Sequence, residues 1–185
     1  MNMEINPSEY KILIVDDVMS NVLLLKVLLT NEKFAIATAN NGRQALEQVD
    51  KEHPDLVLLD VMMPDLSGFE VAQRLKSNPD TADIPIIFLT ALNSTTDIVK
   101  GFQAGASDFI SKPFNKEELI IRVTHQVSLV AAKRIILNKT EELQRIIAGR
   151  DKLYSVIAHD LRSPMGSIKM VLNMLMLNLP VEKIG

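Results

Sequence analysis

The segment Leu56-Val57-Leu58-Leu59-Asp60 predicts a buried strand that ends at a functional residue, because four consecutive apolar residues are followed by a carboxylate. A strand that is buried on both faces of a parallel sheet is apolar at every position rather than at alternate positions. A charged side chain is seldom buried without a partner, so Asp60 at the end of such a strand requires a function. We therefore take Asp60 as the first candidate for the chemistry of this chain.

Three more runs, each mostly apolar, are followed by polar residues in the same way. The runs cover residues 12–15, 86–89 and 109–111, and the polar residues after them are Asp16 and Asp17, Thr90, and Lys112. In an open parallel sheet the carboxyl ends of the strands meet at one edge, where ligands bind. The four strand ends should therefore bring three carboxylates, a hydroxyl and an ammonium together.

Up to about residue 115 the chain alternates short runs rich in Val, Ile and Leu with longer amphipathic stretches. This alternation predicts an α/β fold in which helices connect the strands of a parallel sheet. We expect five strands, at residues 11–15, 34–39, 56–60, 85–90 and 108–111, with helices in the gaps. Asn115 stands where an N-cap would open the fifth helix, and no proline follows Lys116 until Pro164, so this helix should continue beyond the sheet domain.

The composition is that of a globular protein, with 47% hydrophobic and 23% charged residues among 185. A net charge of −3 gives no overall attraction to nucleic acid or to an anionic membrane, so we expect neither as a partner. Cysteine is absent, which excludes disulfides, and nothing near the N-terminus has the pattern of a signal peptide, so we expect a cytoplasmic location. The most apolar tract, residues 165–179, is interrupted by Lys169, Asn173 and Asn178 and is too broken for a membrane span.

The predicted cluster has a coherent chemistry. Three neighbouring carboxylates would repel one another unless a divalent cation lies among them, and oxygen-only ligands favour Mg²⁺. An ionised Asp60 could then attack a phosphoryl group, while Lys112 and the Thr90 hydroxyl stabilise its oxygens. Taken singly, Asp16 or Asp17 would be explained as a helix cap, and Lys112 as a solvated lysine. The conjunction of all four strand ends favours the functional explanation.

The segment from about residue 11 to residue 130 closely resembles the receiver domain of two-component response regulators. The matching motifs are Asp16-Asp17, the loop Asp60-Val61-Met62-Met63-Pro64 with Gly68, the pair Thr90-Ala91, and Lys112-Pro113-Phe114. The resemblance implies a five-stranded, doubly wound, flavodoxin-like sheet of order 2-1-3-4-5. It also implies that Asp60 accepts a phosphoryl group from a phosphohistidine of a partner histidine kinase or phosphotransfer protein.

The resemblance further implies a role for each remaining residue of the pocket. Mg²⁺ would contact Asp17, Asp60 and the backbone carbonyl of Met62, while Asp16 would act through water. The phosphoryl oxygens would be held by Thr90, Lys112 and the backbone amide of Ala91. Phe109 occupies the aromatic switch position of the family and would turn inward as Thr90 moves toward the phosphoryl group. In the unmodified state a plain core phenylalanine is an equally good explanation of Phe109.

The second half of the chain carries apolar residues at heptad spacing. One row holds every seventh residue from Ile147 to Leu175, and a second runs from Leu143 to Val171, with Arg150 and Pro164 as its interruptions. Two such rows form the seam of a coiled coil or helical bundle, so we expect a homodimer through this helix. The expected organisation is a tail at 1–10, a receiver domain at 11–130, a helical linker at 131–150 and a partial dimerisation segment at 151–185.

The run from Ser155 to Pro164 resembles the phosphoacceptor box of histidine kinase dimerisation domains. A neutral imidazole at His159 could be a nucleophile toward ATP, with Asp160 holding its tautomer or taking its proton. Pro164 lacks an amide donor and should bend the helix. The remaining kinase elements do not appear by residue 185, so we expect a fragment of a hybrid sensor histidine kinase that does not phosphorylate His159 from ATP by itself.

A continuous helix from residue 116 to His159 would rise by roughly 65 Å at about 1.5 Å per residue. A phosphoryl group could not cross that distance, so we expect another kinase to phosphorylate Asp60 and the receiver to regulate an attached kinase core through the linker. Two alternatives stay open, a dimerising scaffold with an inactive pocket and an aspartyl-phosphate phosphatase of the haloacid dehalogenase kind. That phosphatase family places its nucleophile in an Asp-x-Asp arrangement on the first strand, whereas this chain has an adjacent pair and a separate Asp60.

Overall fold

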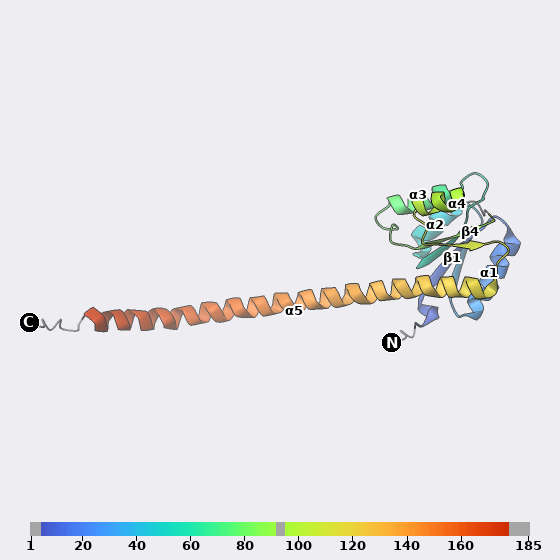
Figure 1. The fold of residues 1–185 in the computed structure, drawn as a ribbon. Helices are drawn as coiled ribbons and strands as arrows, with labels where there is room; N and C mark the ends of the chain where they lie inside the picture. The colour runs from blue at the N-terminus through green and yellow to red at the C-terminus, as the bar shows by residue number, and fades with distance from the viewer. Residues whose placement is uncertain (1–4, 92–94, 178–185) are drawn as a thin grey trace, which may run out of the picture. The chain divides into compact units, whose positions relative to one another are not determined.

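The computed structural model describes residues 5–91 and 95–177 of the chain. Its elements, in chain order, are a 3-10 helix at Pro7–Glu9, β1 at Lys11–Val15, α1 at Met19–Asn31, β2 at Ala35–Ala39, α2 at Gly42–Glu52, β3 at Leu56–Asp60, α3 at Gly68–Ser77, β4 at Ile86–Thr90, α4 at Thr95–Gln103, β5 at Asp108–Ser111 and α5 at Lys116–Leu177. Strands and helices alternate from β1 to α5 (Figure 1). The predicted α/β fold is confirmed.

The five strands form one sheet in the order β2-β1-β3-β4-β5, and every neighbouring pair is parallel. This is the order that the receiver resemblance implied. Two strands begin one residue later than expected, β2 at Ala35 and β4 at Ile86. Phe34 instead donates its amide to Leu29 in the turn after α1, and Pro85 has no amide hydrogen with which to extend β4.

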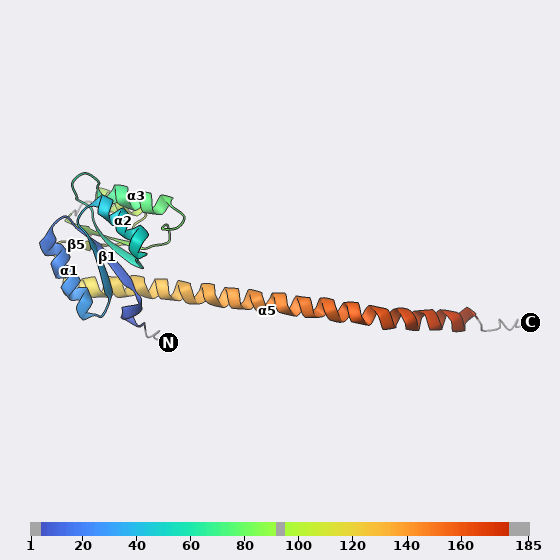
Figure 2. The same ribbon diagram turned by 180° about the vertical axis from the view of Figure 1, so that it is seen from behind.

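The core lies on both faces of the sheet. Every residue of β3 and β4 is buried, as expected for strands that are apolar throughout. On one face the sheet packs against α1 and the first turns of α5, and on the other against α2 and α3 (Figures 1 and 2). Because both faces are covered, the buried charged residues Asp16, Asp55 and Asp60 lie at strand ends or directly next to them.

The last helix begins as the sequence predicts. The Asn115 side chain accepts a hydrogen bond from the Glu118 amide at 3.0 Å, which caps the N-terminus of α5. Four side chains at four-residue spacing, from Leu119 to Ala131, are buried against the sheet. The helix continues through Pro164, which does not end it, to Leu177. The chain divides into two compact units, residues 1–133 and residues 134–185.

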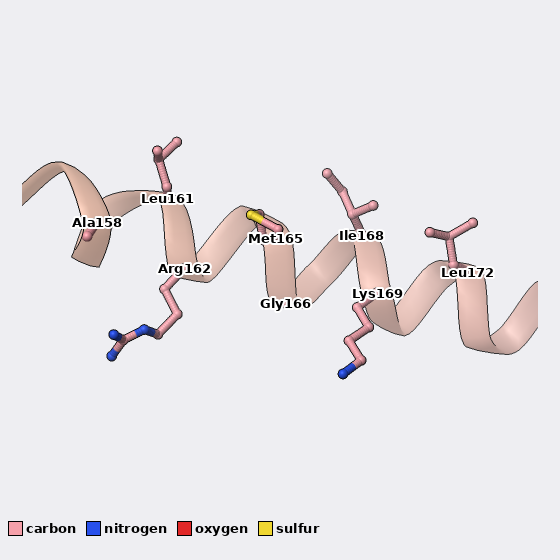
Figure 3. A pocket seen from close by; sticks show the side chains of 8 residues that line it. All are labelled: Ala158, Leu161, Arg162, Met165, Gly166, Ile168, Lys169 and Leu172. Carbon is pink, nitrogen blue, oxygen red and sulfur yellow. The ribbon is translucent and has the colours of Figure 1, made fainter.

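In the second unit the large apolar side chains that the structure describes are exposed along α5. Leu161, Ile168 and Leu172 project from one side of the helix, whereas Arg162 and Lys169 project from the other (Figure 3). Leu161 and Ile168 belong to the heptad row that starts at Ile147, and the homodimer expected through this helix stays a prediction. Among the described residues, no helix is long and apolar enough to cross a membrane.

Candidate functional site

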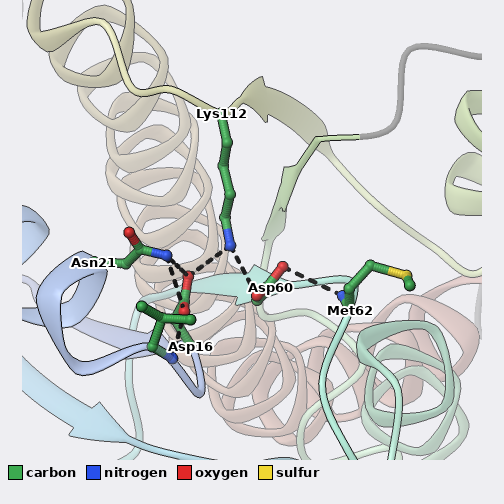
Figure 4. Close-up of polar contacts among 6 residues, drawn as sticks. Asp16, Asn21, Asp60, Met62 and Lys112 are labelled. Carbon is green, nitrogen blue, oxygen red and sulfur yellow. Dashed lines mark hydrogen bonds and ion pairs between the residues drawn. The ribbon is translucent and has the colours of Figure 1, made fainter.

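The candidate site lies at the carboxyl ends of the strands, where the parallel sheet brings four chain segments together. Asp16 and Asp17 follow β1, and Asp60 is the last residue of β3. One carboxylate oxygen from each of these three residues lies within 4.8 Å of the other two. Lys112, which follows β5, reaches into the same cluster (Figure 4). The sequence therefore predicted correctly which acids and which lysine would meet.

Lys112 joins two of the carboxylates. Its Nζ lies 2.8 Å from Asp16 Oδ2 and 2.8 Å from Asp60 Oδ2. The Asp16 side chain is completely buried and that of Asp60 is only 5% exposed, while Lys112 is 20% exposed. Charges this far from water are strongly destabilising when unpaired, so the ammonium is what makes two buried carboxylates tolerable.

Burial and pairing oppose each other in the electrostatics of this cluster. Burial is the largest influence on Asp60 and raises the pKa of its carboxyl, although the hydrogen bond and charge of Lys112 act to lower it. At Lys112 burial acts to lower the pKa of the ammonium, but the hydrogen bonds to Asp16 and Asp60 outweigh it and raise that pKa. Lys112 therefore stays protonated, and Asp60 ionises less readily than an ordinary aspartate.

Asp16 has further donors that the sequence analysis did not identify. The Val18 amide donates to Asp16 Oδ1 at 2.8 Å. The Asn21 side chain donates from Nδ2 to Oδ1 at 3.1 Å and to Oδ2 at 3.0 Å. Asn21 lies in the first turn of α1, five residues after Asp16, and this short spacing next to the acidic pair is the only sequence signal for it.

A tight loop after β3 supports Asp60. The Met62 amide donates to Asp60 Oδ1 at 3.2 Å, which orients the carboxylate. The Gly68 amide donates to the Val61 carbonyl at 3.0 Å, and a Cβ on Gly68 would lie only 2.2 Å from the Asp60 carbonyl oxygen. Glycine is therefore required here because the start of α3 approaches the backbone of the candidate nucleophile. The proposed role of the Met62 carbonyl as a metal ligand stays a prediction.

The residues predicted to bind the phosphoryl group and to switch lie on or next to the neighbouring strands β4 and β5. Thr90 ends β4 and is buried, and its carbonyl accepts the Lys112 amide at 2.8 Å. Ala91 directly follows it and is exposed. The Phe109 ring in β5 is partly buried, with its centroid 4.8 Å from that of Phe102 and 5.8 Å from that of Phe88. The predicted switching movement of Phe109 stays a prediction.

The donor set fits Mg²⁺. All three candidate side chains offer carboxylate oxygens, the ligands that this hard cation prefers, and their spacing allows one ion to contact more than one of them. Asp17 is exposed, so one side of the cluster is open to water. Such an incomplete oxygen site is typical of Mg²⁺, which keeps several waters and adds phosphate oxygens.

The second candidate site lies in the second unit. His159 and Asp160 are both exposed on α5, and His159 Nδ1 is 3.4 Å from Asp160 Oδ1. At this distance Asp160 can orient the imidazole only weakly. The predicted roles of both residues stay predictions.

Comparisons with known proteins agree with the geometry of the first unit. Residues 12–124 match the response regulator receiver domain. The response regulator PleD of Caulobacter vibrioides is 42% identical over 140 residues, which are 76% of this chain and 30% of PleD. A probable transcriptional regulator, ycf27, of Cyanophora paradoxa is 45% identical over 121 residues, 65% of this chain and 48% of ycf27. The matched segment thus spans less than half of either relative.

Two solved structures share the fold. The signal receiver domain of a signal transduction histidine kinase from Syntrophus aciditrophicus has a TM-score of 0.61 and 35% identity, over 64% of this chain and 90% of that one. The chemotaxis protein CheY4 of Vibrio cholerae has a TM-score of 0.61 and 31% identity, over 63% of this chain and 97% of that one. With strand order, acidic cluster and family match in agreement, the chain belongs to the response regulator receiver domain family.

Proposed function

We propose that Asp60 accepts a phosphoryl group from a phosphohistidine of a partner kinase or phosphotransfer protein. Receiver domains of response regulators interact with such partners. The observation that carries the proposal is the placement of Lys112 Nζ at 2.8 Å from Asp60, within a cluster of three carboxylates. This cluster supplies a nucleophile, a fixed cation and an oxygen site for a divalent metal ion.

The proposed transfer makes one bond and breaks one. An Asp60 carboxylate oxygen attacks phosphorus, the phosphorus–nitrogen bond to the donor imidazole breaks, and the imidazole leaves with the electron pair of that bond. Lys112 redirects its ammonium from the carboxylates to a phosphoryl oxygen. The Thr90 hydroxyl and the Ala91 amide donate to the remaining oxygens.

The metal ion in this scheme is Mg²⁺, which Asp17, Asp60 and the Met62 carbonyl would hold, with Asp16 acting through water. When bound, it would neutralise charge on the phosphoryl oxygens. The loop after Asp60 assists by fixing the direction of its carboxylate through the Met62 amide, which donates to Oδ1 at 3.2 Å. The exposed position of Asp17 supports the assignment, since the ion and the donor must both enter from water.

The second part of the proposal concerns the helix that leaves the receiver. We propose that residues 131–150 are a linker and that residues 151–185 are a partial dimerisation segment of a histidine kinase, with His159 as its phosphoacceptor and Asp160 beside it. The exposed apolar rows of α5 support a homodimer through this segment, because an isolated helix with such a face needs a partner. Phosphorylation of Asp60 would then regulate the attached kinase core through α5, a single helix from Lys116 to Leu177.

Treatment with acetyl phosphate and Mg²⁺ tests the first part of the proposal. Intact-mass spectrometry should show one phosphoryl group on the wild-type chain and none on Asp60→Asn. Chelation of Mg²⁺ should abolish the uptake. A wild-type chain that takes up no phosphoryl group would favour an inactive scaffold, whereas steady hydrolysis of diverse phosphate esters would favour a phosphatase.

Analytical ultracentrifugation tests the second part. The chain should sediment as a dimer, and a variant with Leu161→Glu and Ile168→Glu on the apolar face should sediment as a monomer. A monomeric wild-type chain at concentrations of about 0.1 mM would contradict the assignment of this face to a homodimer.

A further inference from the structure

Asn21 donates two of the four hydrogen bonds that the Asp16 carboxylate accepts in the described part of the chain. Among the described residues, Asp16 is the one fully buried carboxylate of the cluster, and its contacts come from Val18, Asn21 and Lys112. Asn21 Nδ2 alone contacts both carboxylate oxygens, at 3.1 and 3.0 Å. A buried carboxylate needs such donors to replace its lost hydration. Part of the charge of Asp16 is thus held by a neutral amide (Figure 4).

The position of Asn21 in α1 explains how it reaches back to Asp16. It is the third residue of this helix, and the residue before the helix, Val18, provides no side-chain cap. Side chains at the third position commonly fold back toward the residues that precede a helix. Asn21 folds back far enough to contact the carboxylate that lies in the pocket.

The contact matters because Lys112 is shared. Its Nζ lies equally close to Asp16 and to Asp60, at 2.8 Å from each. In the transfer proposed above, Lys112 moves to a phosphoryl oxygen. The contact between Lys112 and Asp16 Oδ2 is then weakened or lost, and Lys112 is the one charged donor to this oxygen in the described part of the pocket. Asn21 donates to that same oxygen at 3.0 Å. A buried oxygen that keeps one hydrogen bond costs much less free energy than one that keeps none.

We propose that Asn21 is a positioning residue for phosphoryl transfer, which holds Asp16 so that Lys112 can leave it for the phosphoryl group. Without the Asn21 amide, Lys112 stays paired with Asp16. A smaller fraction of the molecules then presents a free Lys112 ammonium to the phosphoryl group. This inference rests on the proposed function of Asp60. It assigns to Asn21 no contact with the phosphoryl group or with the metal ion.

Three variants test the inference through the initial rate of phosphoryl uptake from acetyl phosphate. Asn21→Leu keeps the shape of the side chain and removes its donor, and should lower the rate at saturating Mg²⁺ by about tenfold, the effect of one hydrogen bond to a charged group. Asn21→Gln restores an amide donor and should recover most of the rate. Asn31→Leu removes an exposed asparagine from the last position of the same helix and should leave the rate unchanged.

A second readout separates positioning from general damage to the pocket. In the proposed scheme Mg²⁺ would be contacted by Asp17 and Asp60, to which Asn21 donates no hydrogen bond, while Asp16 would act only through water. The Mg²⁺ concentration that gives half the maximal rate should therefore change in Asn21→Leu by a smaller factor than the rate itself. Damage to the pocket would change both quantities. A wild-type rate in Asn21→Leu, or a rate in Asn21→Gln as low as in Asn21→Leu, would overturn the inference.

Hydrogen exchange of the Asn21 side chain tests the inference in the wild-type chain, so that the result does not depend on whether a variant folds. The side-chain amide protons of Asn21, followed by NMR, should exchange slowly with water both before and after beryllofluoride and Mg²⁺ are added. Fast exchange after the addition would show that Asn21 releases Asp16, which contradicts the inference. If the wild-type chain takes up no phosphoryl group at all, the proposed function of Asp60 fails instead, and the two failures are thereby distinguished.

Discussion

Replacement of Lys112 by methionine should destabilise the receiver strongly, because two buried carboxylates lose the same partner. Lys112 Nζ is 2.8 Å from both Asp16 and Asp60, whose side chains are 0% and 5% exposed. Removing one partner from a buried ion pair costs about 3–5 kcal/mol. Lys112 is itself 20% exposed, and Asp60 can take up a proton instead of staying unpaired, so we expect a loss near the lower limit, about 3 kcal/mol at pH 7.

The loss of unfolding free energy in Lys112→Met should become smaller as the pH falls. Burial already raises the folded-state pKa of Asp60, and Lys112 acts to lower it, so removing Lys112 raises this pKa further above its unfolded value. Between the unfolded and folded pKa values, the folded variant binds more protons than the unfolded chain. The stability of the variant therefore rises as the pH falls through this window. The difference in unfolding free energy between the variant and wild type should be smaller at about pH 5 than at pH 7.

Tyrosine fluorescence during urea unfolding can isolate the receiver in this assay. The chain has two tyrosines, of which Tyr10 is buried in the receiver core and Tyr154 is exposed in the second unit. In a Tyr154→Phe background, Tyr10 alone reports unfolding. Lys26→Met, which removes an exposed lysine of α1, is the matched control. An unfolding free energy of Lys112→Met within about 0.5 kcal/mol of wild type at pH 7, or a difference that does not change with pH, would refute the reasoning.

Three further predictions concern the same pocket. Gly68→Ala places a Cβ 2.2 Å from the Asp60 carbonyl oxygen, so it should lower the unfolding free energy by about 1–3 kcal/mol and slow phosphoryl uptake, as urea titration and mass spectrometry would detect. In the metal-free chain the Asp60 carboxyl should titrate above the pKa of an ordinary aspartate, because burial raises its pKa, and an NMR pH titration without Mg²⁺ between about pH 7 and pH 4 would check this. Asp17→Asn should raise the Mg²⁺ requirement of uptake by at least about tenfold, the loss seen even for residues that support metal ligands indirectly, and a Mg²⁺ titration of the rate would check it.

The strand ends were predictable because burial leaves so few choices. A short run such as residues 56–59 that is apolar at every position is typical of a central strand, and parallel connections then place Asp60, Thr90 and Lys112 at one edge of the sheet. The order of the strands came from the resemblance and not from the runs themselves. Side-chain pairing across the pocket was not predictable in the same way.

Asn21 shows why part of the site was missed. A single asparagine near the start of a helix is ordinarily solvated, and nothing in the sequence states that its amide turns back to Asp16. The ion pairs that Lys112 makes in the unphosphorylated pocket were missed for a similar reason. Sequence reasoning assigned Lys112 to the phosphoryl group, whereas in the structure it pairs with two carboxylates.

In the proposed function Asp60 is the residue that receives the phosphoryl group. The most direct measurement exposes the chain to a phosphohistidine donor and Mg²⁺, reduces the acyl phosphate with borohydride, and locates the modified residue by peptide mass spectrometry. We expect modification at Asp60 in the wild-type chain and none in Asp60→Asn. Modification at Asp16 or Asp17 in place of Asp60, or undiminished uptake by Asp60→Asn, would contradict this assignment.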